Sequence, residues 1–254
     1  MCTAKDLLVA GSEDGLLIAW NMRDLEVVCT ILAHTGSVLA LRVVCGGSRC
    51  LSCGGDGALR CWSLRTGRQL YCVQEAVSLS VDLSSELTGS QGHEVTGSQH
   101  TALCCVVKES AVVFTQAPGQ CVKAWHLETG EALYDVGPPG QAAMLGTLSG
   151  SVCVLSDGDL LTFYKASTGL EKMQMRLSSH THTFSPTHTL SLTCALHLPR
   201  QDKLLLASGD SILFQVSNTG REPLLVTELP GPVSFLSASE DEKTLLAGSL
   251  SSIL

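Results

Sequence analysis

Three side chains in the first quarter of the chain are of the types that form a hydrolase triad. His34, Ser52 and Asp56 supply an imidazole, a hydroxyl and a carboxylate, which together can activate a nucleophile. The sequence lacks the Gly-x-Ser-x-Gly and His-Glu-x-x-His patterns that accompany such groups in hydrolases. We therefore expect no catalytic residues and assign these three side chains a structural role, which the repeat described below explains.

The twelve cysteines are the next group that could do chemistry. Cys50 and Cys53 form a Cys-x-x-Cys pair, but no second pair or pair of histidines stands at the spacing of a zinc site. On a strand, residues three apart point to opposite faces of the sheet, so the two thiols would need a bend to share a metal. We expect free cysteines that pack as small apolar residues, with a metal or redox site as the alternative.

Nucleotide cofactors are equally poorly supported. Gly55 to Arg60 approaches a dinucleotide-binding motif, but the last position is arginine and the glycines fit a tight turn. No Gly-Lys dipeptide occurs, so the phosphate-binding loop of nucleotide hydrolases is missing from the sequence. We expect no cofactor and no metal, and interpret the alternating Thr and His at 178–188 as a polar loop, with metal binding as the alternative.

Composition is typical of one acidic globular domain. The chain has 254 residues, 44% of them apolar, and a formal net charge of −8. Apolar runs such as Ser37–Cys45 are shorter than the roughly 18 residues of a membrane-spanning helix, and residues 1–6 do not form a secretory leader. We expect the protein in the cytoplasm, with the nucleus as the alternative, and no membrane partner.

A repeat of about one propeller blade is visible in the sequence. Asp14-Gly15 is followed by Trp20, and Asp56-Gly57 by Trp62, with 42 residues between the corresponding positions. An Asp-Gly pair between two apolar runs predicts a β-hairpin, because glycine accepts the positive φ of a two-residue turn. Each unit therefore reads as a strand, a tight turn and a second strand.

A second turn marker supports the same phase. Trp62, Trp125 and Tyr164 are each followed four residues later by a Thr-Gly pair. The pairs are Thr66-Gly67, Thr129-Gly130 and Thr168-Gly169, and a further pair stands at Thr219-Gly220. We interpret these pairs as a second hairpin in each unit.

These markers resemble the WD-repeat family, whose blades end in a Trp-containing strand followed by a Thr-Gly type of turn. The resemblance covers most of the chain, and its most complete unit runs from His34 to Trp62. In that family His34, Ser52, Asp56 and Trp62 correspond to a hydrogen-bonded network inside one blade, which implies a structural role. The other units depart from the pattern at the following positions: Ala10 for Ser, Gly119 for Asp, Tyr164 for Trp, and a unit with His188 and Asp210 that lacks Trp.

The repeat predicts an all-β fold, a WD-repeat β-propeller of about five four-stranded blades plus a partial one, with an incomplete or open ring. We count 21 strands: three at 7–10, 16–20 and 27–32, four full units ending near 74, 136, 177 and 229, and two strands at 233–237 and 244–248. We assign residues 1–254 to a single partial propeller domain with insertions near 77–100 and 178–188. Open blade edges would invite pairing with another chain.

The predicted function is a non-enzymatic scaffold that presents propeller loops to protein or peptide partners. The candidate contacts are Glu13, Thr35, Ser37, Gln116 and Asp157, together with Arg60, Arg65 and Arg68. We interpret these arginines, with Arg42 and Arg49, as a solvated outer face, and expect no nucleic-acid partner because the net charge is negative. The alternative is a regulatory or sensor segment of a larger signalling ATPase of the NACHT-and-WD-repeat type; an enzyme built on a propeller would need a polar cluster in the central channel.

Overall fold

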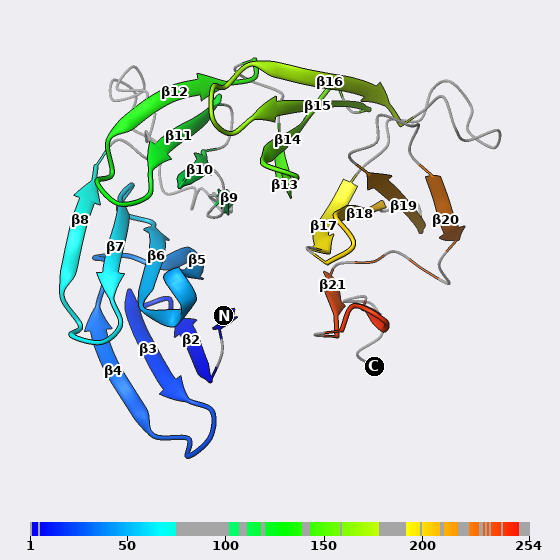
Figure 1. Ribbon diagram of the computed structural model, residues 1–254. Helices are drawn as coiled ribbons and strands as arrows, with labels where there is room; N and C mark the ends of the chain where they lie inside the picture. The colour runs from blue at the N-terminus through cyan, green and yellow to red at the C-terminus, as the bar shows by residue number, and fades with distance from the viewer. Residues whose placement is uncertain are drawn as a thin grey trace, which may run out of the picture. The chain divides into compact units, whose positions relative to one another are not determined.

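A computed structural model gives the fold of the chain (Figure 1). It describes residues 2–4, 6–74, 102–106, 111–117, 120–138, 143–157, 159–177, 192–198, 200–208, 211–217, 224–228, 231, 233, 235–239 and 241–248. The predicted insertions at 77–100 and 178–188, and Gly119, His188, Asp210 and Thr219-Gly220, lie outside these residues. The described part falls into two compact units, and the assignment to a single domain stays a prediction.

The first unit contains two complete sheets, each with its strands in sequence order. One sheet consists of β1 (Cys2–Ala4), β2 (Leu7–Gly11), β3 (Leu16–Asn21) and β4 (Val27–Leu32). The other consists of β5 (Val38–Val44), β6 (Arg49–Gly54), β7 (Leu59–Ser63) and β8 (Gln69–Val73), with a 3₁₀ turn over Cys45–Gly47 after β5. All neighbouring strands in both sheets are antiparallel.

The second unit contains two four-stranded sheets and a two-stranded one. The first sheet has β13 (Ala143–Leu148), β14 (Ser151–Ser156), β15 (Leu160–Lys165) and β16 (Glu171–Arg176). The second has β17 (Leu192–Leu198), β18 (Lys203–Ser208), β19 (Ile212–Ser217) and β20 (Leu224–Glu228). The third pairs β21 (Phe235–Ala238) with β22 (Leu245–Gly248).

One further sheet is formed by β9 (Ala102–Val106), β10 (Val112–Gln116), β11 (Val122–His126) and β12 (Ala132–Val136), and the division into units passes through it. The described strands therefore form five four-stranded sheets and one pair, as the sequence predicts. The predicted count of 21 strands is wrong by one, because it misses β1. β1 has only three residues, which is too short for an alternating pattern that would predict a strand. The form of the ring stays a prediction.

Both predicted turn types occur at the expected positions. Gly15 and Gly57, the glycines of the Asp-Gly pairs, have φ of 82° and 77°, which a side chain would disfavour. Trp20 pairs with Leu8 across β2 and β3, and Trp62 pairs with Cys50 across β6 and β7. The two tryptophans therefore occupy the same position in their sheets, and the 42-residue offset holds for their partners too.

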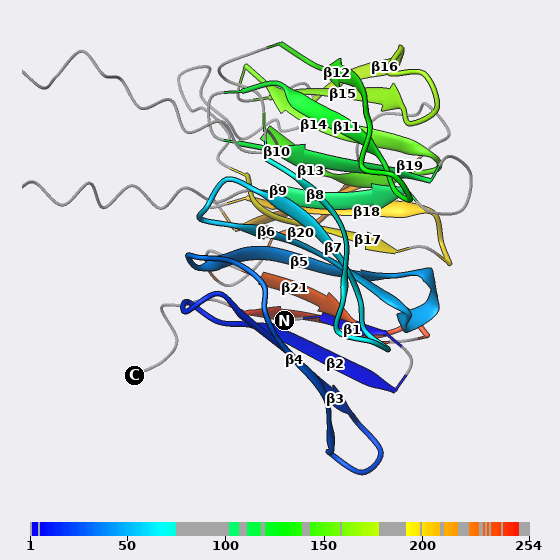
Figure 2. The same cartoon turned by 90° about the vertical axis from the view of Figure 1, so that its left-hand side faces the viewer.

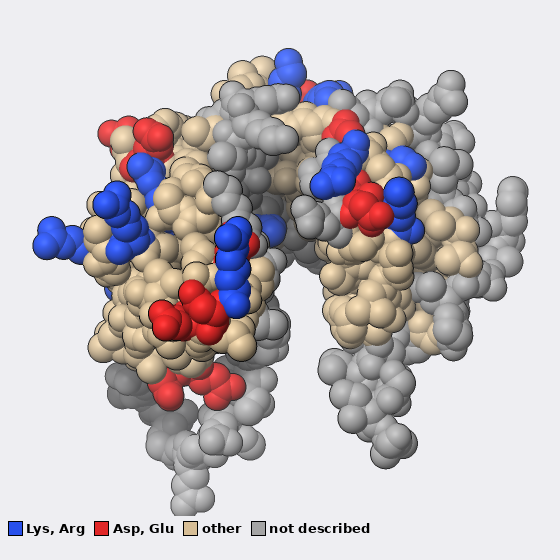
Figure 3. Space-filling view, turned by 60° about the horizontal axis from the view of Figure 1, so that its bottom comes forward, with Lys and Arg blue, Asp and Glu red and all other residues tan. Residues whose placement is uncertain are grey.

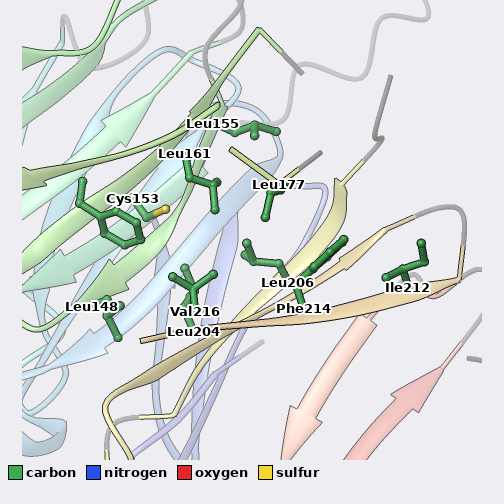
Figure 4. Close-up of a cluster of buried hydrophobic side chains, with 11 residues drawn as sticks. Leu148, Cys153, Leu155, Leu161, Leu177, Leu204, Leu206, Ile212, Phe214 and Val216 are labelled. Atoms are coloured by element: carbon green, nitrogen blue, oxygen red, sulfur yellow. The ribbon is translucent and has the colours of Figure 1, made fainter. Parts of the chain in front are cut away.

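Apolar side chains between successive sheets form the core of each unit. In the first unit Leu17 and Ile31 of one sheet pack with Cys50 and Trp62 of the next. In the second unit Leu161 and Phe163 of the β13–β16 sheet pack with side chains of the β17–β20 sheet, among which Phe214 is fully buried (Figure 4). The inner strands β6 and β14 are buried along almost their whole length, so side chains on both of their faces are covered.

Candidate functional site

A chain of hydrogen bonds crosses the β5–β8 sheet and joins the four side chains that the repeat singles out. The Trp62 indole Nε1–H donates to Ser52 Oγ over 2.9 Å, and Ser52 Oγ lies 2.7 Å from His34 Nε2. His34 Nδ1 lies 2.8 Å from Asp56 Oδ1. His34, Ser52 and Trp62 are buried, so their polar atoms depend on one another for hydrogen bonds.

The proton positions along this chain follow from burial and chemistry. Burial lowers the pKa of His34, more strongly than the neighbouring Asp56 raises it, so the ring is neutral at pH 7 and carries one N–H. Asp56 is ionised and only accepts, so the proton belongs on Nδ1. Ser52 then accepts from Trp62 and donates to His34 Nε2. Each donor from Trp62 to His34 therefore has an acceptor in the next side chain of the network.

Arg60 belongs to this network, which corrects its assignment to a solvated face and to the partner contacts. Its side chain is only 14% exposed and donates from Nη1 to Asp56 Oδ2 over 2.6 Å and to the Ala33 carbonyl over 3.0 Å. The same Nη1 lies 2.5 Å from His34 Nδ1, but that nitrogen already bears the proton given to Asp56. The sequence held a signal for this position, since residues two apart on a strand share a face and Arg60 stands two before Trp62.

Asp56 is the acceptor at which the network ends. Burial acts to raise its pKa, but hydrogen bonds from Arg60 and His34 outweigh this and hold the pKa at about 2. The carboxylate also accepts the backbone N–H of Ala58 and, at 3.3 Å, that of Thr35. The network thereby fixes the β6–β7 turn to the segment that enters β5.

The Ser-His-Asp geometry resembles a catalytic triad, but its setting favours a structural role. Ser52 is 0% exposed, and its hydroxyl already accepts the indole hydrogen of Trp62. A nucleophile must reach a substrate carbonyl, which a fully enclosed hydroxyl does not. What this arrangement does is hold three chain segments in fixed relative positions.

These segments form an exposed surface at one end of the two sheets in the first unit, here called the turn surface and defined as Glu13, Asp14, Thr35, Ser37 and Gly55. Backbone hydrogen bonds run from Val38 N–H to the Ser12 carbonyl over 3.0 Å and from Gly55 N–H to the Ser37 carbonyl over 2.8 Å. Glu13, Asp14, Thr35 and Gly55 are exposed, and Ser37 is half-buried. Three of the predicted contacts, Glu13, Thr35 and Ser37, are thus brought together.

The remaining predicted contacts lie elsewhere. Gln116 is buried on β10 with 7% of its surface exposed, which removes it from the set of available contacts. Asp157 is exposed in the turn after β14, in the other unit. Arg65 and Arg68 are exposed in the β7–β8 turn, at the opposite end of β7 from the turn surface. Arg49 is half-buried, so the predicted arginine face reduces to Arg42, Arg65 and Arg68.

Two tyrosines outside the repeat markers connect outer strands to later turns. Tyr71 of β8 donates its phenol hydrogen to the Leu127 carbonyl over 2.8 Å, and its ring lies against Gly130. Tyr134 of β12 donates to the Ala166 carbonyl, and its ring lies against Gly169. Both glycines belong to Thr-Gly turns, and each tyrosine stands nine residues after a tryptophan, which is the signal that could have revealed them.

The cysteines and the charge distribution give no sign of a ligand site. Among the described residues no group of His, Cys, Asp or Glu is placed to hold a metal, and burial raises the pKa of Cys53 to about 12. On the face shown in Figure 3, Lys and Arg are interspersed with Asp and Glu and do not form a continuous basic area. In the described part of the chain no helix is long and apolar enough to cross a bilayer.

The fold is shared with solved structures. A chain in the crystal structure of the Mitotic Checkpoint Complex superposes with a TM-score of 0.68 at 15% identity, covering 96% of this chain and 68% of that one. No protein-family model matches the sequence. The repeat markers, the four-stranded sheets and the relatives below show a chain built of WD repeats with a β-propeller-like fold.

Several relatives are similar to this chain along nearly its whole length. NACHT domain- and WD repeat-containing protein 1 of Mus musculus is 28% identical over 95% of this chain. A p21-activated protein kinase-interacting protein 1-like of Xenopus laevis is 23% identical over 94% of it. The chain spans 14% of the length of the former and 62% of the latter.

Proposed function

We propose that the protein is a non-enzymatic scaffold that binds a protein or peptide partner at its turn surface. The observation that carries the proposal is the buried network from Trp62 to Asp56. This network holds the exposed turns in fixed positions, and a partner could bind to them there. A rigid surface binds without the entropic cost of ordering loops. The names of WD-repeat relatives, one of them a kinase-interacting protein, support a role in protein binding.

The chemistry of the turn surface favours a basic partner segment. Glu13 and Asp14 are exposed carboxylates, whereas the charge of Asp56 is neutralised by Arg60. Opposite charges at the rim of an interface steer association and fix orientation. A cytoplasmic location, with no cofactor and no nucleic acid, belongs to the same proposal.

The test is affinity capture with the full chain, followed by mass spectrometry of the bound proteins. The variant carries Glu13→Arg and Thr35→Arg, and the matched control carries Glu171→Arg, an exposed position on β16. We expect proteins that bind the wild type and the control to be lost from the double variant. Retention of every bound protein by the double variant would refute the turn surface as the contact site.

A second candidate function rests on the length of the relatives. Because 95% of this chain matches 14% of a NACHT domain- and WD repeat-containing protein, the chain corresponds to one part of a larger protein in that comparison. We propose as the alternative a regulatory WD-repeat segment of a signalling ATPase. Flanking coding sequence with a Gly-x-x-x-x-Gly-Lys-Ser/Thr motif would support it, and a gene without that motif would exclude it.

A further inference from the structure

The outer strand of the first sheet has an unusual composition for a sheet edge. β4 lies last in its sheet, so one side of its backbone has no partner strand there. Its sequence, Val-Val-Cys-Thr-Ile-Leu, contains no charge, no proline and no glycine. Val27, Val28 and Leu32 are 56%, 45% and 72% exposed. Exposed, uncharged edge strands of this kind are templates for pairing with another strand.

The last strands of the other four-stranded sheets carry features that discourage such pairing. β12 contains Asp135, β16 contains Glu171, Lys172 and Arg176, and β20 contains Glu228. β8 is uncharged, but its Tyr71 is held on the Leu127 carbonyl and its polar Gln69 is exposed. Charges on an edge are a common protection against a further strand, and β4 lacks it.

The hairpin that leads into β4 indicates what its partner would carry. The β3–β4 hairpin projects past the neighbouring strands (Figure 2) and exposes Leu25 to 75%. Arg23 at its tip is paired with Asp6 and not with the exposed carboxylates of Asp24 and Glu26 beside the start of β4. Asp24 accepts hydrogen bonds from the Asn21 side-chain amide and the Glu26 N–H and keeps its negative charge. A basic residue at the end of an incoming strand would meet these carboxylates, whereas a second copy of this acidic chain would add to the repulsion.

We propose that the free edge of β4 accepts an extended segment of a partner protein by strand addition, and that this segment is rich in β-branched residues and has a Lys or Arg beside Asp24 and Glu26. Main-chain hydrogen bonds would supply affinity, and contacts with Val28 and Leu32 would select apolar residues at alternate positions. The β4 edge shares no residue with the turn surface, and its test changes Val28 and Leu32 instead of Glu13 and Thr35, so the two proposals can fail separately.

The test uses a fluorescein-labelled peptide, Lys-Val-Thr-Ile-Thr-Val-Lys, and fluorescence anisotropy with the full chain. We expect saturable binding to the wild type that weakens at least tenfold in the double variant Val28→Lys, Leu32→Lys. The matched control is Leu133→Lys on β12, an exposed apolar residue on another outer strand, which should bind as the wild type does. Both altered chains should keep the wild-type circular dichroism spectrum, because the changed side chains are exposed.

Three results would overturn the proposal. One is the absence of binding to the wild type, and another is equal binding of a backbone N-methylated peptide, which has the same side chains but lacks the hydrogens that add a strand. The third is a concentration-dependent dimer in light scattering that disappears in the Val28→Lys, Leu32→Lys variant, since β4 would then pair with a second copy.

Discussion

The β5–β8 and β13–β16 sheets share one strand order but are held together by different interactions. In the former, Trp62 pairs across the strands with Cys50, and Ser52 lies two residues further along β6. In the latter, Tyr164 pairs with Val152, and Val154 takes the position of Ser52. Both sheets pack apolar side chains against a neighbouring sheet, but the first adds a buried polar network, whereas the second is packed in an apolar cluster with Phe163 and Phe214.

The difference shows that apolar packing and hydrogen-bonded networks have different effects on a sheet: the first stabilises it, and the second also fixes the positions of its residues. Apolar packing stabilises a sheet without specifying direction, since the hydrophobic effect depends on buried area. A hydrogen-bonded network requires defined distances, and a buried group that loses its partner costs about 1 to 3 kcal/mol. In the first unit the network connects the β6–β7 turn with the segment that enters β5 and so holds these exposed segments in one arrangement.

The largest expected effect comes from the apolar cluster that packs the β13–β16 sheet against the β17–β20 sheet, to which Phe214 of β19 belongs. Phe214→Ala would open a cavity among fully buried side chains and lower the free energy of unfolding by about 3 to 5 kcal/mol. Phe235→Ala, at a position 49% exposed, is the control and should change it by less than about 1 kcal/mol. Urea unfolding followed by circular dichroism measures both. A smaller loss for Phe214→Ala than for Ser52→Ala would reverse the comparison.

Ser52→Ala would break the polar network in the other sheet. It leaves the Trp62 indole N–H and one nitrogen of His34 buried without their partner, so we expect a loss of about 1 to 3 kcal/mol in the same unfolding measurement. The reciprocal Val154→Ser places a hydroxyl among apolar residues and should also destabilise. A higher free energy of unfolding for Val154→Ser would contradict this expectation, because it would mean that one added hydroxyl finds hydrogen-bond partners in the apolar sheet.

Acid should weaken the polar sheet selectively. The pKa of Asp56 is about 2 in the folded chain, against about 3.9 in an unfolded one, so its contribution of up to about 2 kcal/mol is present above pH 4 and is lost as the pH falls towards 2. The lowered pKa of His34 acts in the same direction, since the unfolded chain takes up its proton near pH 6.5. Melting temperatures between pH 3 and 8 should therefore fall less for Asp56→Asn than for wild type. Parallel curves would contradict the role of this carboxylate.

The smallest effect is expected at the tyrosines that tie outer strands to Thr-Gly turns. Tyr134→Phe removes the hydrogen bond to the Ala166 carbonyl but keeps the ring against Gly169, so we expect a loss of about 1 kcal/mol. Tyr134→Ala removes the ring contact as well and should cost more. Calorimetric melts of both variants measure these losses of stability. Equal losses would show that the contact between the Tyr134 ring and Gly169 does not stabilise the fold.

The repeat could be predicted from the sequence because its turns require particular residues. The Asp-Gly and Thr-Gly positions are set by backbone conformation, and Trp20 and Trp62 mark the same register. Local patterns did not reveal β1, which has only three residues, or the burial of Gln116. Arg60 was misassigned because its charge suggested solvent, whereas its place beside Trp62 on one strand face decides its partners.

His34 has one more neighbour whose importance its own chemistry does not reveal. A methyl group at Gly54 would stand 2.2 Å from the imidazole Nδ1, closer than atoms approach without displacement. Gly54 thus has no side chain to contribute, yet even alanine there would push the ring away from Ser52 and Asp56. A mutational scan should find that substitutions at Gly54 lower stability almost as much as substitutions of His34. A substitution at one of the two positions would then require a compensating substitution at the other.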